Sequence, residues 1–161
     1  FNEHPEMKLV IAPHVVSDSH LREILDKVKR PCIRYTEATE ENVTQADCLI
    51  IDCYGLLSSI YRYGEISYIG GGFGVGIHNV LEAAVYGIPV IFGPNNKKFR
   101  EAQHLLEQKG GFEVTGYDDF KRLMDKFLSD EAYLQQAGKA AGNYVNHNAG
   151  ALEKIMKDIT L

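Results

Sequence analysis

The segment ISYIGGGFGVGIHNVLEAA, residues 66–84, decides the fold of this chain. It begins with a short apolar run, passes through a loop in which five of the seven residues 70–76 are glycine, and continues into an alanine-rich helical pattern. A buried strand, a turn and a helix in this order form the unit from which parallel α/β sheets are built. The segment therefore predicts a parallel sheet covered by helices.

The same alternation extends over the rest of the chain. Short runs rich in Val, Ile and Phe predict six strands, at residues 8–12, 32–35, 48–52, 66–69, 89–92 and 112–114. The spacing of apolar residues predicts helices at 21–28, 57–61, 80–86, 99–106, 120–128, 131–144 and 149–159. We expect an α/β fold with a doubly wound, six-stranded, Rossmann-like parallel sheet in the order 3-2-1-4-5-6, with extra C-terminal helices.

This expected order locates a ligand site. Ligands of such sheets bind outside the carboxyl ends of the strands at the switch point, which are here the first and the fourth. The first strand leads into Pro13 and His14, and the fourth leads into the glycine-rich loop. The most unusual segment of the sequence therefore falls where the fold class places a ligand.

Length and composition describe an ordinary globular domain. The chain has 161 residues, 45% of them hydrophobic, and its 17 Lys and Arg against 22 Asp and Glu give a formal charge of −5, which argues against a nucleic-acid partner. No apolar run approaches the roughly 18 residues of a membrane span. The cysteines, Cys32, Cys48 and Cys53, are too few for a disulfide framework and indicate reduced cytoplasmic thiols. We expect a single domain over residues 1–161, in which residues 1–7 are a frayed linker remnant of a longer protein.

The glycine-rich loop has the chemistry of an anion site. Gly71, Gly72 and Gly74 permit positive φ and let backbone amides approach a ligand closely, and the start of the next helix favours a phosphate group. The loop is not a dinucleotide fingerprint, because Ile77 stands where the third glycine would be, and no Gly-Lys-Ser/Thr of a P-loop follows. The structural alternative is a flexible turn that only packs a strand against a helix.

The residues after the loop allow two interpretations. Asn79 and Glu82 have the spacing of a capping box at the start of a helix. The functional interpretation is that Glu82 accepts hydrogen bonds from the hydroxyls of a ribose while the loop amides hold a phosphate. His78 is either a phosphate donor or a residue that only begins the helix.

Several motifs, in order and spacing, resemble those of the 3-deoxy-D-manno-octulosonic acid (Kdo) transferases, which are GT-B glycosyltransferases of Gram-negative bacteria. The resemblance rests on SYIGGGFG (67–74), GIHNVLEAA (76–84) and YGIPVIFGP (86–94), and extends to IAPH (11–14), DCYGLL (52–57) and FRE (99–101). It covers most of the chain, from about residue 8 to residue 106.

The resemblance implies that the chain is the C-terminal, donor-binding half of an inverting two-domain enzyme. Such an enzyme transfers Kdo from CMP-Kdo to a lipid A precursor in lipopolysaccharide biosynthesis, at the cytoplasmic face of the bacterial inner membrane. The family's general base lies in the N-terminal half, so we expect the isolated chain to be inactive. The acceptor and the membrane would be reached only through that missing half. No cofactor and no metal are expected, because the chain has no D-x-D motif.

Together with the loop chemistry, the resemblance implies a set of residues that bind CMP-Kdo, none of them catalytic. The set is Pro13, His14, Tyr54, Gly55, Leu56, Gly71, Gly72, Gly74, His78, Asn79, Val80, Leu81 and Glu82. Two of these depart from the family pattern, since His14 stands in the place of an arginine and Leu56 in the place of a glutamate. Histidine is a weaker and pH-dependent phosphate partner, which leaves the choice of donor nucleotide open.

Other functions remain compatible with the residues. A GT-B transferase or epimerase that uses a UDP-sugar is one alternative, and CMP and UMP differ at a single base edge. A non-catalytic nucleotide- or phosphate-binding module is another. A dehydrogenase-like domain is disfavoured by the failed dinucleotide fingerprint.

Overall fold

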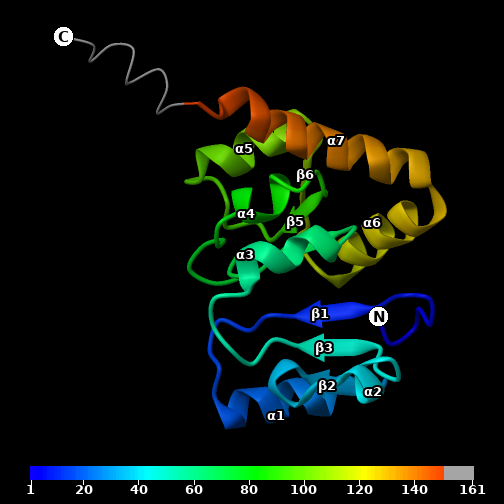
Figure 1. Ribbon diagram of the computed structural model, residues 1–161. Helices are drawn as coiled ribbons and strands as arrows, with labels where there is room; N and C mark the ends of the chain where they lie inside the picture. The colour runs from blue at the N-terminus through cyan, green and yellow to red at the C-terminus, as the bar shows by residue number, and fades with distance from the viewer. Residues whose placement is uncertain (151–161) are drawn as a thin grey trace. The chain divides into compact units, whose positions relative to one another are not determined.

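The computed structural model describes residues 1–150, and these fall into two compact units that divide within a short helix, after Ser59 (Figure 1). Each unit contains its own parallel sheet. All six predicted strands are present, each within about two residues of its expected position. The predicted helix over 149–159 lies outside the described residues from 151 onward.

The first unit is built on a three-stranded parallel sheet. Its elements are β1 (Leu9–Ile11), α1 (Asp18–Lys27), β2 (Cys32–Arg34), the 3-10 turn η1 (Tyr35–Glu37), α2 (Glu40–Val43) and β3 (Cys48–Ile50), and α3 (Leu57–Ile60) follows at the division. The short helix α2 has no counterpart among the predicted helices. Its capping box pairs Thr39 with Asn42, a combination that lacks the usual Glu or Gln.

The strand order of the first unit differs from the expected one. The sheet runs β1-β3-β2, so β3 is central and β2 lies at an edge, whereas the order 3-2-1 placed β2 in the middle. The central strand of a sheet loses the most contact with water, and β3 carries the buried Cys48 and Ile50. By contrast β2 contains Arg34, and Lys8 directly precedes β1. The enclosed position is thus taken by the uncharged β3, and the strand that contains Arg34 lies at an edge.

The two faces of this sheet have different surroundings. Leu21 of α1 packs with Cys48 and Ile50 in a small core on one face. The opposite face carries Val10, Leu49 and Ile33, which are register partners across the three strands, and Val10 is 47% exposed. Burial of the strands on both faces, as their apolar runs predict, is therefore incomplete within this unit.

The amino-terminal segment is tied to the first unit by Arg30. The guanidinium donates hydrogen bonds to the carbonyl oxygens of Phe1, His4 and Pro5 at 3.1, 2.7 and 2.9 Å, and it lies over the Phe1 ring at 4.2 Å from the centroid. The same guanidinium also donates through its Nε to the Asp47 carboxylate and forms an ion pair with it. Residues 1–7, which the sequence predicts to fray, thus contact the first unit through their carbonyl groups.

The second unit contains the other parallel sheet, in the order β4-β5-β6 that the sequence predicted. Its elements are η2 (Tyr61–Tyr63), β4 (Ser67–Ile69), α4 (Leu81–Ala84), β5 (Val90–Phe92), α5 (Arg100–Glu107), β6 (Gly111–Glu113), α6 (Tyr117–Ser129) and α7 (Glu131–Asn148). The central strand β5 is buried at every residue, as the uninterrupted apolar run 89–92 predicts.

Helices cover both faces of this second sheet. On one face, a core of buried residues joins β4 and β5 to α4, α5 and α7, and includes Ala83, Leu105 and Ala141. On the other face, Phe112 of β6 makes an edge-to-face contact with Phe127 of α6, with ring centroids 5.2 Å apart. The second unit therefore has the layered arrangement expected for a doubly wound sheet.

Candidate functional site

The glycine-rich loop of the second unit is an ordered turn closed by its own backbone. The amides of Gly74 and Gly76 both donate to the carbonyl oxygen of Gly71, at 2.9 and 3.2 Å, and the amide of His78 donates to the carbonyl oxygen of Gly70 at 3.1 Å. Gly71 has a φ of +88°, and a Cβ there would overlap the Gly76 carbonyl oxygen. Three amides of the segment thus already donate hydrogen bonds within it, so only its other amides could donate to a phosphate.

A second backbone segment packs tightly against this loop. A Cβ on Gly72 would lie 2.5 Å from the Gly93 nitrogen, and the Asn95 amide donates to the Gly72 carbonyl oxygen at 2.9 Å. The Asn95 side chain donates to the Gly74 carbonyl oxygen at 2.5 Å. The loop is therefore held from outside as well as from within, unlike a flexible turn.

Asn79 and Glu82 are joined, but by a different bond from a capping box. The Asn79 Oδ1 accepts from the Leu81 amide at 3.0 Å, and the Asn79 Nδ2 donates to the Glu82 Oε1 at 3.1 Å. A capping box would instead link each side chain to the other residue's backbone. The helix α4 that follows has only four residues, shorter than the predicted 80–86. Asn79 therefore orients the Glu82 carboxylate.

The predicted residues around this carboxylate differ in accessibility. His78 and Asn79 are exposed, and Leu81 is half-buried. Val80 is 3% exposed and belongs to the core, so only its backbone can meet a ligand. Tyr61 was missed by sequence reasoning: burial, together with the nearby negative charge of Glu82, raises the pKa of its hydroxyl. The sequence signal at Tyr61 was the spacing of apolar residues in 57–61, which predicts a helix with Tyr61 on its buried face.

The remaining predicted residues form a second cluster, in the first unit. Pro13 and His14 follow β1, while Tyr54, Gly55 and Leu56 follow β3. Because β1 and β3 are hydrogen-bonded parallel neighbours, both segments leave the same edge of one sheet. The sequence predicts the ligand site at the carboxyl ends of the first and fourth strands. In the structure it is the pairing of β1 with β3 that brings the segments after β1 and β3 together.

Asp52 anchors the second of these segments. Its carboxylate accepts hydrogen bonds from the Thr36 amide at 3.0 Å and the Thr36 hydroxyl at 2.6 Å. Burial acts to raise the pKa of Asp52, but these hydrogen bonds outweigh it and hold the pKa below its ordinary value. Beyond this anchor, Gly55 has a φ of +93° and Tyr54 is 79% exposed. An ionised Asp52 thus fixes the base of a loop that presents an aromatic ring to solvent.

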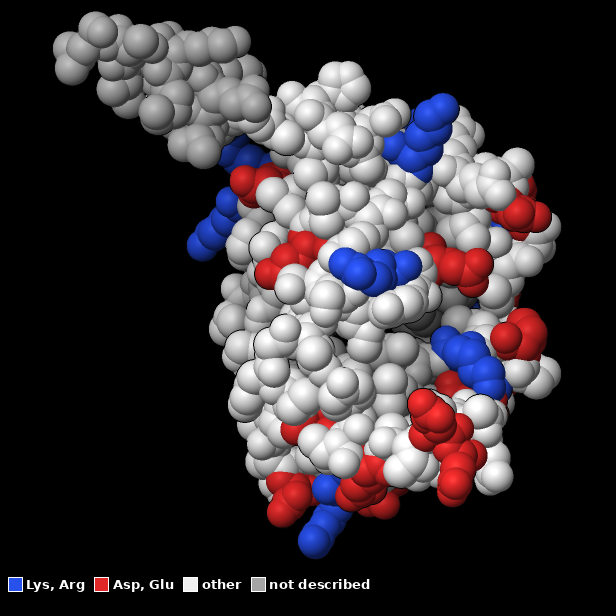
Figure 2. Space-filling view, viewed as in Figure 1, with Lys and Arg blue, Asp and Glu red and all other residues white. Residues whose placement is uncertain are grey.

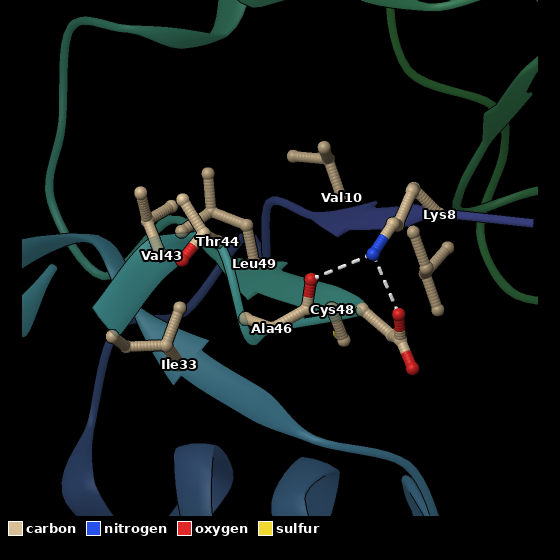
Figure 3. Close-up of a pocket in the computed structure, with 10 residues that line it drawn as sticks. Lys8, Val10, Ile33, Val43, Thr44, Ala46, Cys48 and Leu49 are labelled. Atoms are coloured by element: carbon tan, nitrogen blue, oxygen red, sulfur yellow. Dashed lines mark hydrogen bonds and ion pairs between the residues drawn. The ribbon is translucent and has the colours of Figure 1, made fainter. Parts of the chain in front are cut away.

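Each unit also contains a hollow. In the second unit a cavity of about 360 Å³ is lined by residues 77–81 and by Phe99 and Glu101 at the start of α5. In the first unit a hollow of about 320 Å³ lies over the open sheet face that includes Val10 and Leu49, and Lys8 at its rim donates to Ala46 and Asp47 (Figure 3). No predicted site residue lines the hollow of the first unit, whereas four of them line the cavity of the second unit.

Charge is scattered over the face of the molecule that Figure 2 shows. Figure 2 shows acidic and basic side chains interspersed on the visible face of the described residues, without a continuous basic field. Within residues 1–150 no cluster of His, Cys, Asp and Glu has the geometry of a metal site. None of the helices in that part of the chain is both long and apolar enough to span a membrane.

Comparison with known proteins identifies the relatives of this chain. It is 32% identical over 125 residues to 3-deoxy-D-manno-octulosonic acid transferase of Aquifex aeolicus, across 76% of the chain and 34% of that protein. The chain is homologous to the 3-deoxy-D-manno-octulosonic acid transferases. The resemblance drawn from its motifs is confirmed by this match.

Further transferases of the same name match most of the chain. The Haemophilus influenzae protein is 29% identical over 160 residues, across 96% of the chain and 37% of that protein, and the Rickettsia felis protein is 28% identical over 149 residues, across 87% and 31%. The chain thus spans about a third of the length of these Kdo transferases. No protein-family model matches it.

A solved structure shares the fold. The C-terminal CMP-Kdo binding domain of WaaA from Acinetobacter baumannii superposes with a TM-score of 0.69, over 88% of this chain and 90% of that one. At 15% identity this likeness concerns the fold alone. It supports an α/β fold with parallel sheets, as in that C-terminal domain.

Proposed function

We propose that this chain binds CMP-Kdo, as the donor-binding half of an inverting GT-B transferase that delivers Kdo to a lipid A precursor in lipopolysaccharide biosynthesis. The similarity to Kdo transferases over 76% of the chain carries the proposal. The solved relative is itself a CMP-Kdo binding domain, which adds support at the level of the fold.

The geometry of the second unit suits one nucleotide phosphate and a ribose. CMP carries a single phosphate, for which the loop amides not engaged within the turn are suited donors. The Glu82 carboxylate, oriented by Asn79, accepts hydrogen bonds from the ribose hydroxyls. Preorganised donors at the phosphate also stabilise the charge that develops on CMP as it leaves.

We assign the cluster in the first unit to donor binding as well, on its resemblance to the family's motifs. Its residues, Pro13, His14, Tyr54, Gly55 and Leu56, occupy the positions of the family's nucleotide-binding motifs. The exposed Tyr54 ring offers a surface on which a base can stack. His14 and Leu56 replace charged residues of the family, which leaves the donor nucleotide open, and a UDP-sugar is therefore the second candidate donor.

The complete enzyme would need more than this chain. We expect the general base and the acceptor site in an N-terminal half, so the isolated chain should bind donor without transferring sugar. The same half would make the contact with the cytoplasmic face of the inner membrane.

The proposal is tested by NMR titration of the labelled chain with CMP, and with UMP and AMP as controls. CMP should shift the amides of residues 70–82 saturably and bind more tightly than either control. Glu82→Gln should weaken CMP binding by about 10- to 100-fold, because a hydrogen bond to a charged group contributes about 1.5–3 kcal/mol. Glu107→Gln, at the far end of α5, is the matched control and should change nothing.

Deoxy-CMP isolates the role of the ribose. If Glu82 binds the 2′-hydroxyl, deoxy-CMP should bind wild type weakly and lose little more in Glu82→Gln. Equal affinities for CMP, UMP and AMP, or shifts confined to other residues, would contradict the donor assignment. A clear preference for UMP would favour the UDP-sugar alternative.

A further inference from the structure

Two cysteines of the first unit lie opposite each other on neighbouring strands, and the proposed donor site gives them no role. Cys32 of β2 and Cys48 of β3 are register partners in the parallel ladder. Neighbouring strands lie about 4.7–4.9 Å apart, which falls within the roughly 4.4–6.8 Å that separates the Cα atoms of a disulfide. The backbone of the sheet therefore already holds these two residues at a spacing that a disulfide can bridge.

Both side chains belong to the same face of the sheet. Cys48 is 1% exposed and forms a small core with Leu21 of α1, and Cys32 packs against that core. Burial raises the pKa of the Cys48 thiol to about 12, and the neighbouring Cys32 side chain acts in the same direction. That second effect requires the two thiols to lie close together. The pair thus meets the other requirement of a disulfide, which is that the two side chains do not point apart.

The two thiols differ in accessibility, which gives each a separate part in an exchange reaction. Cys32 is half-buried on the edge strand β2, so a small reagent can reach it from solvent. Cys48 is enclosed on the central strand, and only a sulfur already joined to Cys32 comes within its reach. Redox-active cysteine pairs divide in the same way into an attacking and a resolving thiol.

We propose that Cys32 and Cys48 form a redox-active pair, which a small-molecule disulfide such as oxidised glutathione converts reversibly into a disulfide bond. The Cys32 thiolate attacks one sulfur of the small disulfide, releases one small thiolate and leaves a mixed disulfide. The Cys48 thiol then loses its proton, its thiolate attacks the Cys32 sulfur, and the second small thiolate leaves. Overall the two cysteines lose two electrons and two protons, and the small disulfide takes up both and becomes two thiols.

The bond links the two strands that carry the Asp52 anchor. Thr36 lies four residues after Cys32, and Asp52 lies four residues after Cys48. The Thr36 amide and hydroxyl both donate to the Asp52 carboxylate. A disulfide that closes the loop over residues 32–48 restricts the unfolded chain and so stabilises this part of the fold. The oxidised pair therefore holds Thr36 beside Asp52 more persistently, whatever the loop that follows β3 binds.

The test treats the folded full chain with oxidised glutathione at mildly alkaline pH, because the thiolate is the reacting form. It uses the Cys53→Ser variant, which removes the third cysteine. Mass spectrometry should find the loss of two hydrogen atoms and one pair of peptides linked through Cys32 and Cys48, and dithiothreitol should restore the original mass. The Thr36 amide should exchange with solvent about tenfold or more slowly in the oxidised chain than in the reduced one.

Two further substitutions, each combined with Cys53→Ser, separate the two steps. Cys48→Ala removes the resolving thiol, so the reaction should stop at the mixed disulfide, with one glutathione on Cys32. Cys32→Ala removes the attacking thiol and should leave Cys48 unmodified. Circular dichroism shows whether each variant is folded, and Cys32→Ala, at a half-buried edge position, keeps the test decisive if the change at the buried Cys48 unfolds the chain.

Three results would overturn the proposal. A chain with both cysteines that stops at the mixed disulfide would show that the two sulfurs do not meet in the fold. A Cys32–Cys48 bond that forms only in urea would show that the folded backbone prevents it. An unmodified folded chain would show that Cys32 is out of reach of the reagent. None of these results bears on the proposed function, because no nucleotide enters the experiment.

Discussion

The tight packing of the glycine-rich loop against Gly93 provides a quantitative test. At Gly72 an added Cβ would lie 2.5 Å from the Gly93 nitrogen and 2.7 Å from its Cα. Both atoms are backbone, so no side chain can rotate away, and the loop or the segment after β5 must shift. Overpacking of this kind costs about 1–3 kcal/mol. Gly72→Ala is therefore expected to lower the free energy of unfolding by that amount.

The control lies two residues along the same loop. A Cβ on Gly74 would meet only the Gly71 carbonyl oxygen, at an ordinary 3.6 Å. Alanine there restricts the unfolded chain, which stabilises a protein by about 0.4–1 kcal/mol where the backbone allows it. Gly74→Ala should therefore leave the free energy of unfolding unchanged or raise it slightly, although it adds the same methyl group to the same loop.

Urea unfolding measures the difference. With a denaturant slope of about 1–3 kcal/mol per molar urea, a loss of about 2 kcal/mol lowers the midpoint by roughly 1 M. Amide hydrogen exchange in β4 and β5 shows whether the loss falls on the second unit. CMP binding should weaken in Gly72→Ala, because the loop is displaced. A wild-type midpoint for Gly72→Ala, or an equal loss in both variants, would refute the packing argument.

Two further predictions concern titratable groups. Because the folded pKa of Asp52 is depressed, its ionised form stabilises the fold above the pKa of the unfolded chain, and this contribution disappears as pH falls through the folded pKa. Thr36→Val should raise that pKa in an NMR titration and destabilise the chain at neutral pH, with a difference that vanishes in acid; an unchanged pKa would contradict the assigned cause. Burial raises the pKa of Cys48 to about 12, so its thiol should resist iodoacetamide at neutral pH in the folded chain and react in urea. Because the Cys48 thiol must stay neutral in the fold, the free energy of unfolding should also fall as pH rises above the ordinary thiol pKa. Peptide mass spectrometry that finds Cys48 alkylated in the folded chain would show instead that the thiol is accessible.

Local signals in the sequence predicted the elements and part of the site. The uninterrupted apolar runs located all six strands, because a strand buried in a parallel sheet needs apolar residues whatever its partners are. The order β4-β5-β6 was predicted correctly. The motif around Asn79 and Glu82 indicated the family, and the structure places these two side chains in contact.

Pairing between distant segments was beyond these signals. An apolar run does not specify which strand it will pair with, so the central place of β3 between β1 and β2 could not be predicted from it. The tether from Arg30 to residues 1–7 likewise depends on carbonyl groups that folding brings to it.

The sequence by itself thus determined the α/β class, the position of the strands and the family, since each of these depends on residue type and spacing along the chain. Only the tertiary structure decided the strand order of the first unit, the clamping of the glycine-rich loop by Gly93 and Asn95, and the cavity that joins Asn79 to Phe99 and Glu101. These features are contacts between segments far apart in the chain. Their geometry depends on how the sheets and helices pack, which no local pattern of residues records.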